Sequence, residues 1–418
     1  MKTAFLLDSF PKISETFILN QITNLIDRGI DVQIFALNKS NEAQKHDAFF
    51  KYKLNTLTHY APIMPKNSFK KYIKGSKIFM RILLTKPLTA FKALNFFKYG
   101  RDALNLRLLF YADTFTDKNR DYDVIQAHFG PIGNIALKLR ETGAFKGSLV
   151  CTFHGYDINR TDIKHNPNYY QRLIKAGDCF TANSHYSADR LKDLGFPAKK
   201  IKILPNPIDC ESFKHTGKKF HTKNNPINIL TVGRLSEEKG HIFALEAIKQ
   251  LIHKKVSLCY HIVGEGHLHD ELNNFINKNH LKEFVVLHGN KKQSELIGIY
   301  KKADLFLLPA IISASDEVDT QAVVLQVAQA MQLPVIASNI GGIPEGIKNN
   351  KTGFIIEQKD TQAIAEKVLF FIKNPEQTEI MGKQAEKFIK QKYDKKQITT
   401  DLIEIYRSIS EKQKESNS

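Results

Sequence analysis

The chain has 418 residues, of which 42% are hydrophobic and 25% charged. This composition is that of a globular protein rather than a disordered one, and the length predicts two large domains. Lys and Arg number 61 against 43 Asp and Glu, giving a formal net charge of +18, which favours polyanionic partners such as nucleic acid, anionic lipid or phosphorylated substrates.

The amino-terminal stretch MKTAFLLDSFPK is not expected to direct export, because Asp8 interrupts its apolar run. The longest apolar run, LFLLPAII at residues 305–312, is far shorter than the roughly 20 residues of a membrane-spanning helix. Four widely separated cysteines without a C-x-x-C pair disfavour a zinc site and favour buried thiols in a reducing compartment. We therefore expect a cytoplasmic protein.

Short, continuously apolar runs alternate with helical stretches along the chain. Such runs indicate strands covered on both faces, as in parallel α/β sheets. One series lies at residues 3–8, 32–37, 124–129, 149–155, 179–184 and 201–207, and a second at 227–233, 258–264, 285–289, 304–309, 334–338 and 353–356. The pattern predicts two Rossmann-like units in tandem.

Polar, Pro- and Gly-containing sequence at residues 208–226 predicts a hinge between the units. The expected domains are therefore residues 1–207, with a basic insertion at about 66–110, and residues 208–390. Residues 391–418 are expected to form a helix whose last ten residues fray.

The segment from Lys66 to Arg101 holds ten basic residues and no Asp or Glu. Lys70, Lys74, Lys77 and Arg81 fall on one helical face, with Phe79, Ile82 and Leu83 roughly opposite. Such a basic amphipathic helix can lie on an anionic membrane surface. A solvated basic helix packed on its own domain is an equal alternative, and nucleic-acid binding ranks last because no nucleic-acid-binding motif accompanies the charge.

The stretch TVGRLSEEKG places Gly233, Arg234 and Lys239 between an expected strand and helix. Glycine allows the backbone to approach a ligand closely, and two cations at a helix start suit a diphosphate. A surface loop remains the alternative. The stretch IVGEGHLHDEL repeats the strand-to-glycine pattern at Gly264 and Gly266, but His269 replaces the last glycine of G-x-G-x-x-G and weakens a nicotinamide interpretation.

Several motifs together resemble a known family. VGRLSEEKG, IVGEGHL, ADLFLLPA, LPVIASNIGGIPEGI and KTGFII resemble, in order and spacing, the carboxy-terminal half of the family 4 retaining glycosyltransferases. These have the GT-B fold, an α/β architecture of two Rossmann-like domains with parallel sheets facing across a cleft. FPKISETFILNQI, DYDVIQAHFGPIGNIAL and TFHGYDI are similar to the transferases that build colanic acid, amylovoran and related bacterial surface polysaccharides. The resemblance spans about residues 3–390, except 66–110.

The resemblance implies a role for individual residues. Arg234 and Lys239 would hold the donor diphosphate, and His154 would face the donor sugar. The remaining implied contacts are Gly233, Gly264, Gly266 and Gly289 for the nucleotide, and Ser14, Glu15 and Thr16 for the acceptor. A hydrogen-bonded structural histidine at position 154 and a simple helix start at residues 14–16 are the structural alternatives.

Two acidic positions of the family motif fall at Asp319 and Val327. Asp319 would contact the sugar with one methylene less reach, whereas Val327 cannot accept a hydrogen bond from the ribose. We expect the loss to cost about 1.5 to 3 kcal/mol of donor binding. Helix packing is the structural alternative for Val327. The D-x-D of Asp121–Asp123 leads into a strand and is not expected to bind metal, since cationic side chains would serve the diphosphate.

The resemblance therefore implies a hexosyltransferase that moves a sugar from a nucleotide-diphosphate sugar to a lipid-linked glycan at the inner face of the cell membrane. UDP is the favoured nucleotide, with GDP and ADP possible. Three alternatives stay open: a non-catalytic GT-B scaffold or glycan-binding subunit, a nucleotide-sugar epimerase, and a nucleic-acid-binding protein.

Overall fold

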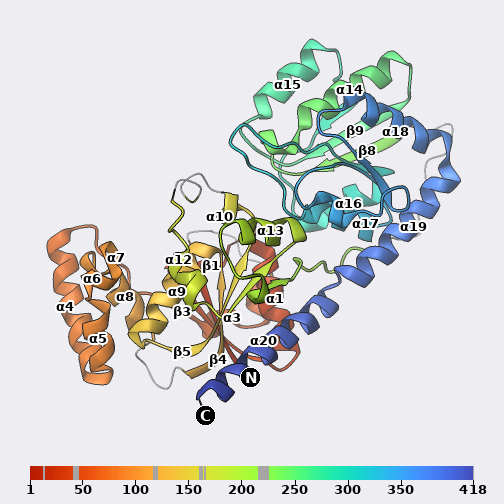
Figure 1. The fold of residues 1–418 in the computed structure, drawn as a ribbon. Coiled ribbons are helices and arrows are strands. Elements are labelled where there is room, and N and C mark those ends of the chain that lie inside the picture. Colours follow the sequence, from red (N-terminus) through yellow and green to blue (C-terminus); the bar gives the residue numbers. More distant parts are fainter. Residues whose placement is uncertain are drawn as a thin grey trace. The chain divides into compact units, whose positions relative to one another are not determined.

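The computed structural model divides the chain into two compact units (Figure 1). Unit 1 comprises residues 1–183, 188–204 and 399–418, and unit 2 comprises residues 184–187 and 205–398. The structure describes residues 1–12, 15–40, 47–115, 121–159, 163, 166–214 and 226–417. Most of the expected hinge, residues 215–225, lies outside this part.

Unit 1 is built on a parallel 7-stranded sheet with the order β3-β2-β1-β4-β5-β6-β7. Its strands are β1 (Lys2–Phe10), β2 (Asp31–Lys39), β3 (Thr58–Tyr60), β4 (Asp121–His128), β5 (Lys146–Phe153), β6 (Cys179–Ala182) and β7 (Ile201–Ile203). The helices outside the insertion are α1 (Thr16–Asp27), α2 (Asp47–Lys51), α3 (Leu54–Leu57), α9 (Gly130–Thr142), α10 (Tyr156–Asn159), α12 (Gln171–Ala176), α13 (His185–Asp193) and η2 (Ala198–Lys200). Each of the six apolar runs expected here contains a strand, and among the described strands of unit 1 only the short β3 is not predicted from the sequence.

The basic insertion folds into five consecutive helices: α4 (Ser68–Thr85), α5 (Pro87–Ala93), α6 (Phe96–Tyr99), α7 (Arg101–Leu104) and α8 (Arg107–Asp113). Asn67 caps α4 by accepting a hydrogen bond from Lys70 N at 3.1 Å, and α4 packs beside α5 and α8 (Figure 1). Ile78 and Ile82 are buried in the core of unit 1, and Phe79 and Leu83 pack against that core. The apolar face expected for a lipid surface is therefore the inner face of α4.

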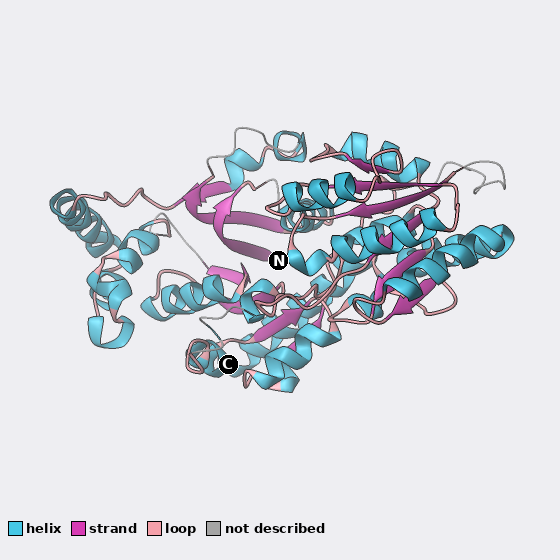
Figure 2. Ribbon diagram, turned by 90° about the horizontal axis from the view of Figure 1, so that it is seen from above, coloured by secondary structure: helices cyan, strands magenta, loops and turns pink. Residues whose placement is uncertain are grey.

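Unit 2 carries a parallel 6-stranded sheet with the order β10-β9-β8-β11-β12-β13. Its strands are β8 (Ile227–Val232), β9 (Leu258–Val263), β10 (Val285–Leu287), β11 (Leu305–Leu308), β12 (Val335–Ser338) and β13 (Gly353–Ile356). Its helices are η3 (Glu237–Lys239), α14 (His241–His253), α15 (His269–Lys278), α16 (Gln293–Lys302), α17 (Val323–Ala330), η4 (Ile343–Gly346), α18 (Thr361–Lys373) and α19 (Pro375–Lys392). Helices cover both sheets (Figure 2), which explains why the strands are continuously apolar.

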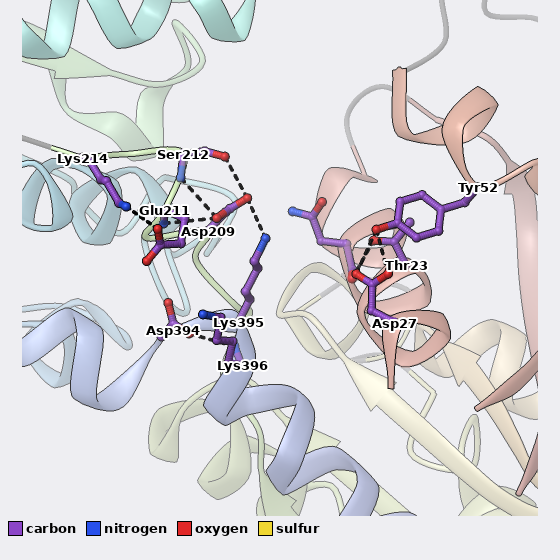
Figure 3. A network of polar contacts seen from close by, with 11 residues as sticks. Thr23, Asp27, Tyr52, Asp209, Glu211, Ser212, Lys214, Asp394, Lys395 and Lys396 are labelled. Carbon is purple, nitrogen blue, oxygen red and sulfur yellow. Dashed lines mark hydrogen bonds and ion pairs between the residues drawn. The ribbon is translucent and has the colours of Figure 1, made fainter. Parts of the chain in front are cut away.

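The last helix, α20 (Lys395–Asn417), begins in unit 2 and continues into unit 1. At its start, Lys395 Nζ lies 2.9 Å from Asp209 Oδ2, which also accepts a hydrogen bond from Ser212 (Figure 3). Further along, the buried Tyr406 hydroxyl donates to Gln126 Oε1 at 2.8 Å. No helix among the described residues combines the length and apolarity needed to cross a bilayer.

Candidate functional site

The strand order of unit 2 reverses between β8 and β11, and open α/β sheets bind ligands at the carboxyl edge beside such a switch point. Lys239 follows β8 and Asp319 follows β11. Their side chains meet there, with Lys239 Nζ 2.6 Å from Asp319 Oδ2 and exposed fractions of 15% and 14%. The structure thus brings together two residues that the sequence assigned to donor binding and catalysis.

Asp319 is held ionised by its surroundings. Burial opposes its charge, but Lys239 and the backbone N–H groups of Ala322 and Gln321 outweigh burial and lower the pKa of the carboxyl below its usual value. Asp319 Oδ1 accepts from Ala322 N at 2.9 Å, immediately before α17. The pair therefore offers an ammonium and a fixed carboxylate side by side.

The expected nucleotide-contact glycines pack backbone on backbone at the same edge. Gly233 N bonds Val263 O at 2.9 Å, and Gly264 N bonds Gly289 O at 3.0 Å. A Cβ on Gly264, whose φ is +146°, would lie 1.8 Å from Gly233 O, and one on Gly266 would lie 2.3 Å from Leu235 O. Side chains at positions 264 and 266 are excluded by these contacts, so the loops after β8, β9 and β10 stay close together.

Arg234 points a largely exposed side chain from the loop after β8, with 72% of it accessible. Its Nη2 lies 2.8 Å from the buried Glu238 Oε1, which also accepts from Ser236 Oγ at 2.7 Å. The buried His241 donates from Nε2 to Arg234 O at 2.8 Å, and burial lowers the pKa of this imidazole to about 4. Glu238 and His241 thus fix the Arg234 loop, a function that the sequence interpretation did not assign to them.

Val327 lies in α17 and is 8% exposed within the apolar core of unit 2. Its side chain packs in the same cluster as Ala322, Leu325 and Ile340. This burial is what the alternative interpretation of Val327, a residue that packs its helix against the core, predicts. A valine here offers no hydrogen bond to a ligand.

In unit 1 the strand order reverses between β1 and β4, and the residues near that edge form an aromatic and imidazole cluster. His154, directly after β5, shares a hydrogen bond of 3.0 Å between its Nε2 and His128 Nδ1 at the end of β4. The rings stack, and Phe17 and Phe129 also pack on His154. Burial, and to a lesser extent His154, lower the pKa of His128 well below its usual value, so His128 is neutral.

Asp157 ties the two loops of this cluster together. Its Oδ1 accepts from His154 N at 2.9 Å and Gly155 N at 3.1 Å, and its Oδ2 accepts from Gly130 N at 2.8 Å. Burial raises the pKa of Asp157 to about 6 although these N–H groups oppose the shift. His128 and Asp157 belong to the AHFG and FHGYD segments, but the sequence interpretation assigned a role to His154 alone.

Two of the expected acceptor residues, Glu15 and Thr16, lie at the start of α1. Thr16 is exposed, and Glu15 Oε1 accepts from Lys12 Nζ at 3.0 Å. The next residue, Phe17, contacts His154 with ring centroids 4.5 Å apart, so this helix start and His154 are neighbours. Ser14 lies outside the described residues. Asp123, by contrast, is near the opposite edge of the sheet, where its Oδ2 accepts from Lys2 N at 2.8 Å.

Across the described ranges, no group of three or more His, Cys, Asp or Glu side chains is arranged to hold a metal ion. The two Rossmann-like units are those of a GT-B glycosyltransferase. The solved structure of Anabaena HepE in complex with UDP shows the same fold, with a TM-score of 0.71 at 17% identity, covering 98% of this chain and 100% of that one.

The chain belongs to the glycosyltransferases. Residues 14–212 match Glycosyltransferase Family 4, and residues 213–388 match Glycosyl transferases group 1. WcaL of Salmonella typhimurium, assigned to colanic acid biosynthesis, is 33% identical over 98% of this chain and 100% of its own length. AmsK of Erwinia amylovora, an amylovoran biosynthesis glycosyltransferase, is 35% identical over 87% of this chain and 89% of its own length. These relatives confirm the resemblance to the surface-polysaccharide transferases, and the protein is a hexosyltransferase.

A third relative extends the comparison to an enzyme named by its substrates. The UDP-Gal:α-D-GlcNAc-diphosphoundecaprenol α-1,3-galactosyltransferase of Escherichia coli is 30% identical over 58% of this chain and 64% of its own length.

Proposed function

We propose that this glycosyltransferase moves a hexose, with retention of anomeric configuration, from a nucleotide-diphosphate sugar to a lipid-linked glycan in the synthesis of a bacterial surface polysaccharide. The observation that carries the proposal is the Lys239–Asp319 pair of 2.6 Å at the switch point of unit 2. UDP is the favoured nucleotide, since UDP is bound in the HepE structure and named in the galactosyltransferase's donor. The undecaprenol carrier in that relative's name supports a lipid-linked acceptor.

Lys239 and Arg234 would hold the donor diphosphate and stabilise the negative charge that grows as the bond from the sugar's anomeric carbon to phosphate oxygen breaks. The acceptor hydroxyl would attack from the face of the leaving phosphate and pass its proton to a phosphate oxygen. Asp319, kept ionised, would hold the sugar and stabilise its oxocarbenium-like state.

Unit 1 supplies the remaining proposed residues. His154 would contact the transferred sugar, with Glu15, Thr16 and Ser14 contributing to the acceptor site. The packing of Phe17 on His154 supports the grouping of these residues. At the other end of the donor, Gly233, Gly264, Gly266 and Gly289 would admit the nucleotide against the backbone, and Val327 would leave the ribose with one hydrogen bond fewer.

The test is the thermal midpoint of the purified chain against UDP-, GDP- and ADP-hexoses, because a ligand at a hundred times its Kd stabilises by about 2.7 kcal/mol without an acceptor. We expect the largest shift with a UDP-sugar and none in a Lys239→Ala variant. A shift with GDP or ADP donors alone would overturn the nucleotide assignment. No shift with any donor would overturn the proposed donor site.

A further inference from the structure

The helical insertion of unit 1 exposes an apolar surface where a soluble domain would carry polar residues. Most of the exposed large hydrophobic side chains among the described residues fall between Phe69 and Leu104: Phe69, Tyr72, Ile73, Met80, Leu84, Leu88, Phe91, Phe96, Phe97 and Leu104. Leu84 is 82% exposed and Phe97 89%. Scattered surface hydrophobics need no explanation, but a concentration of this kind marks an interaction site.

Helix α4 has two apolar faces. Ile78 and Ile82 form the inner one, at 3% and 0% exposure. On the opposite side, Phe69, Ile73, Met80 and Leu84 recur at spacings of four and seven residues and thus follow one stripe along the helix. We call these four residues the outer stripe. Leu88 and Phe91 of α5, which packs against α4, are exposed as well.

Helix α4 is held to its neighbours by contacts that lie away from the outer stripe. Arg81 pairs with the buried Asp113 of α8, and Lys74 Nζ donates to Ile63 O at 2.9 Å. A Cβ on Gly75 would lie 2.6 Å from Leu106 Cδ1, which shows how closely α4 approaches the segment before α8. Because the inner face of α4 packs against the core of unit 1, the described residues leave the outer stripe exposed.

The basic residues around the outer stripe indicate what kind of partner would bind it. Lys70 and Lys77 are exposed beside the outer stripe, and Lys66, Lys92 and Arg101 are exposed elsewhere in the insertion. No acidic residue occurs between positions 66 and 101. An apolar stripe flanked by lysines fits the boundary of a bilayer with anionic headgroups, where the apolar side chains enter the acyl region and the lysines meet phosphate.

We propose that the outer stripe of α4 docks this glycosyltransferase on an anionic phospholipid surface. This inference deepens the proposed function, because a lipid-linked acceptor resides in such a surface. It rests on different residues from the donor site, so the two proposals can fail separately.

The experiment is flotation of the full chain with vesicles of phosphatidylcholine alone and of phosphatidylcholine mixed with phosphatidylglycerol. We expect flotation with the mixed vesicles that weakens as salt rises. Lys70→Gln with Lys77→Gln should reduce partitioning about 30-fold, since each basic residue near the surface contributes a factor of about five. Matched controls, Lys282→Gln with Lys387→Gln in unit 2, should float like the wild type.

A second variant removes the apolar contribution. Ile73→Gln, Met80→Gln and Leu84→Gln together should lower partitioning at least about tenfold, whereas Phe50→Gln with Ile380→Gln, also at exposed positions, should not. Thermal midpoints establish that each variant is folded. If the stripe variant floats as well as the wild type, the proposal is overturned. It is also overturned if the wild type sediments as a dimer and the stripe variant as a monomer, because the outer stripe would then bind a second copy of the chain. Donor-induced thermal shifts that persist in the stripe variant keep the donor site independent of the result.

Discussion

Lys239 and Asp319 lie 80 positions apart in the chain, yet their charged atoms are 2.6 Å apart across the switch point of the second sheet. The ammonium is thus already placed by a carboxylate before any ligand arrives. A donor diphosphate would enter a site where the cation is oriented and largely desolvated, which strengthens its interaction with phosphate.

Replacing Lys239 with Ala should lower turnover of the preferred donor by at least about a hundredfold, because the growing charge on the leaving phosphate loses its cation. Initial rates with a lipid-linked acceptor measure the effect, and Lys254→Ala, at an exposed lysine after α14, serves as the control. Turnover close to that of the wild type would remove Lys239 from the mechanism.

Asp319→Asn should destabilise the free protein by about 3 kcal/mol at neutral pH, because it leaves a mostly buried lysine without its partner. The pKa of Asp319 is lowered in the folded state, so its stabilisation is present above the unfolded value near 3.9 and is lost as pH falls through the lower folded value. Urea unfolding at pH 7 and pH 3 measures this. A difference in the free energy of unfolding between wild type and variant that is the same at both pH values would contradict the ion-pair explanation.

Val327→Glu restores an acid to the position where the family motif has one. In the free protein the new carboxylate enters an apolar cluster, so we expect the thermal midpoint to fall. If the position faces the ribose, UDP should bind about ten- to a hundredfold more tightly in calorimetry. Val324→Glu, on the same helix, is the matched control, and equal UDP affinity in both variants would show that position 327 does not reach the nucleotide.

His128→Phe keeps a ring between Phe5 and His154 but removes the hydrogen bond to His154. We expect kcat to fall about fivefold, the value of one hydrogen bond, with KM for the nucleotide sugar unchanged. If His128 acts only by positioning His154, adding His128→Phe to His154→Ala should cause no further loss. His59→Phe, at a histidine that stacks on Phe35, controls for the loss of an imidazole.

Asp157→Asn should show the opposite pH dependence to Asp319→Asn. Burial raises the pKa of Asp157 to about 6, so its contribution to stability is full below the unfolded value near 3.9 and declines as pH rises through 6. The free energy of unfolding of the wild type minus that of the variant should thus fall by about 3 kcal/mol between pH 3 and pH 7. A difference that grows with pH would mean that the three backbone N–H groups dominate over burial.

The sequence predicts both sheets well because each buried parallel strand is a continuous apolar run bounded by polar residues. It does not predict β3, since Thr58–Tyr60 is too short and polar to stand out. In α4 the helical spacing is readable, but two apolar faces compete, and only tertiary packing decides that Ile78 and Ile82 face inward.

Contacts between side chains distant in sequence could not be predicted from the residues themselves. His128 reaches His154 because β4 pairs with β5 in a register that places His128 opposite Thr152. The donor-site roles expected of Gly289, Asp319 and Val327 follow from the resemblance rather than from the spacing of the residues. The sequence gives no sign of the roles of Glu238 and His241. Glu238 binds the side chain of Arg234 and His241 binds its carbonyl oxygen, and neither contact follows from a periodic pattern.

The bond from Tyr406 to Gln126 has a consequence for how the protein is made. Tyr406 is fully buried in unit 1, yet the ribosome adds it after every residue of unit 2. During synthesis, Gln126 Oε1 therefore lacks this partner until the residues that follow unit 2 have been added. A truncated product ending before α20 would contain all seven strands of that sheet but would lack the Tyr406 hydrogen bond, so the first domain depends on residues that follow the second one in the chain.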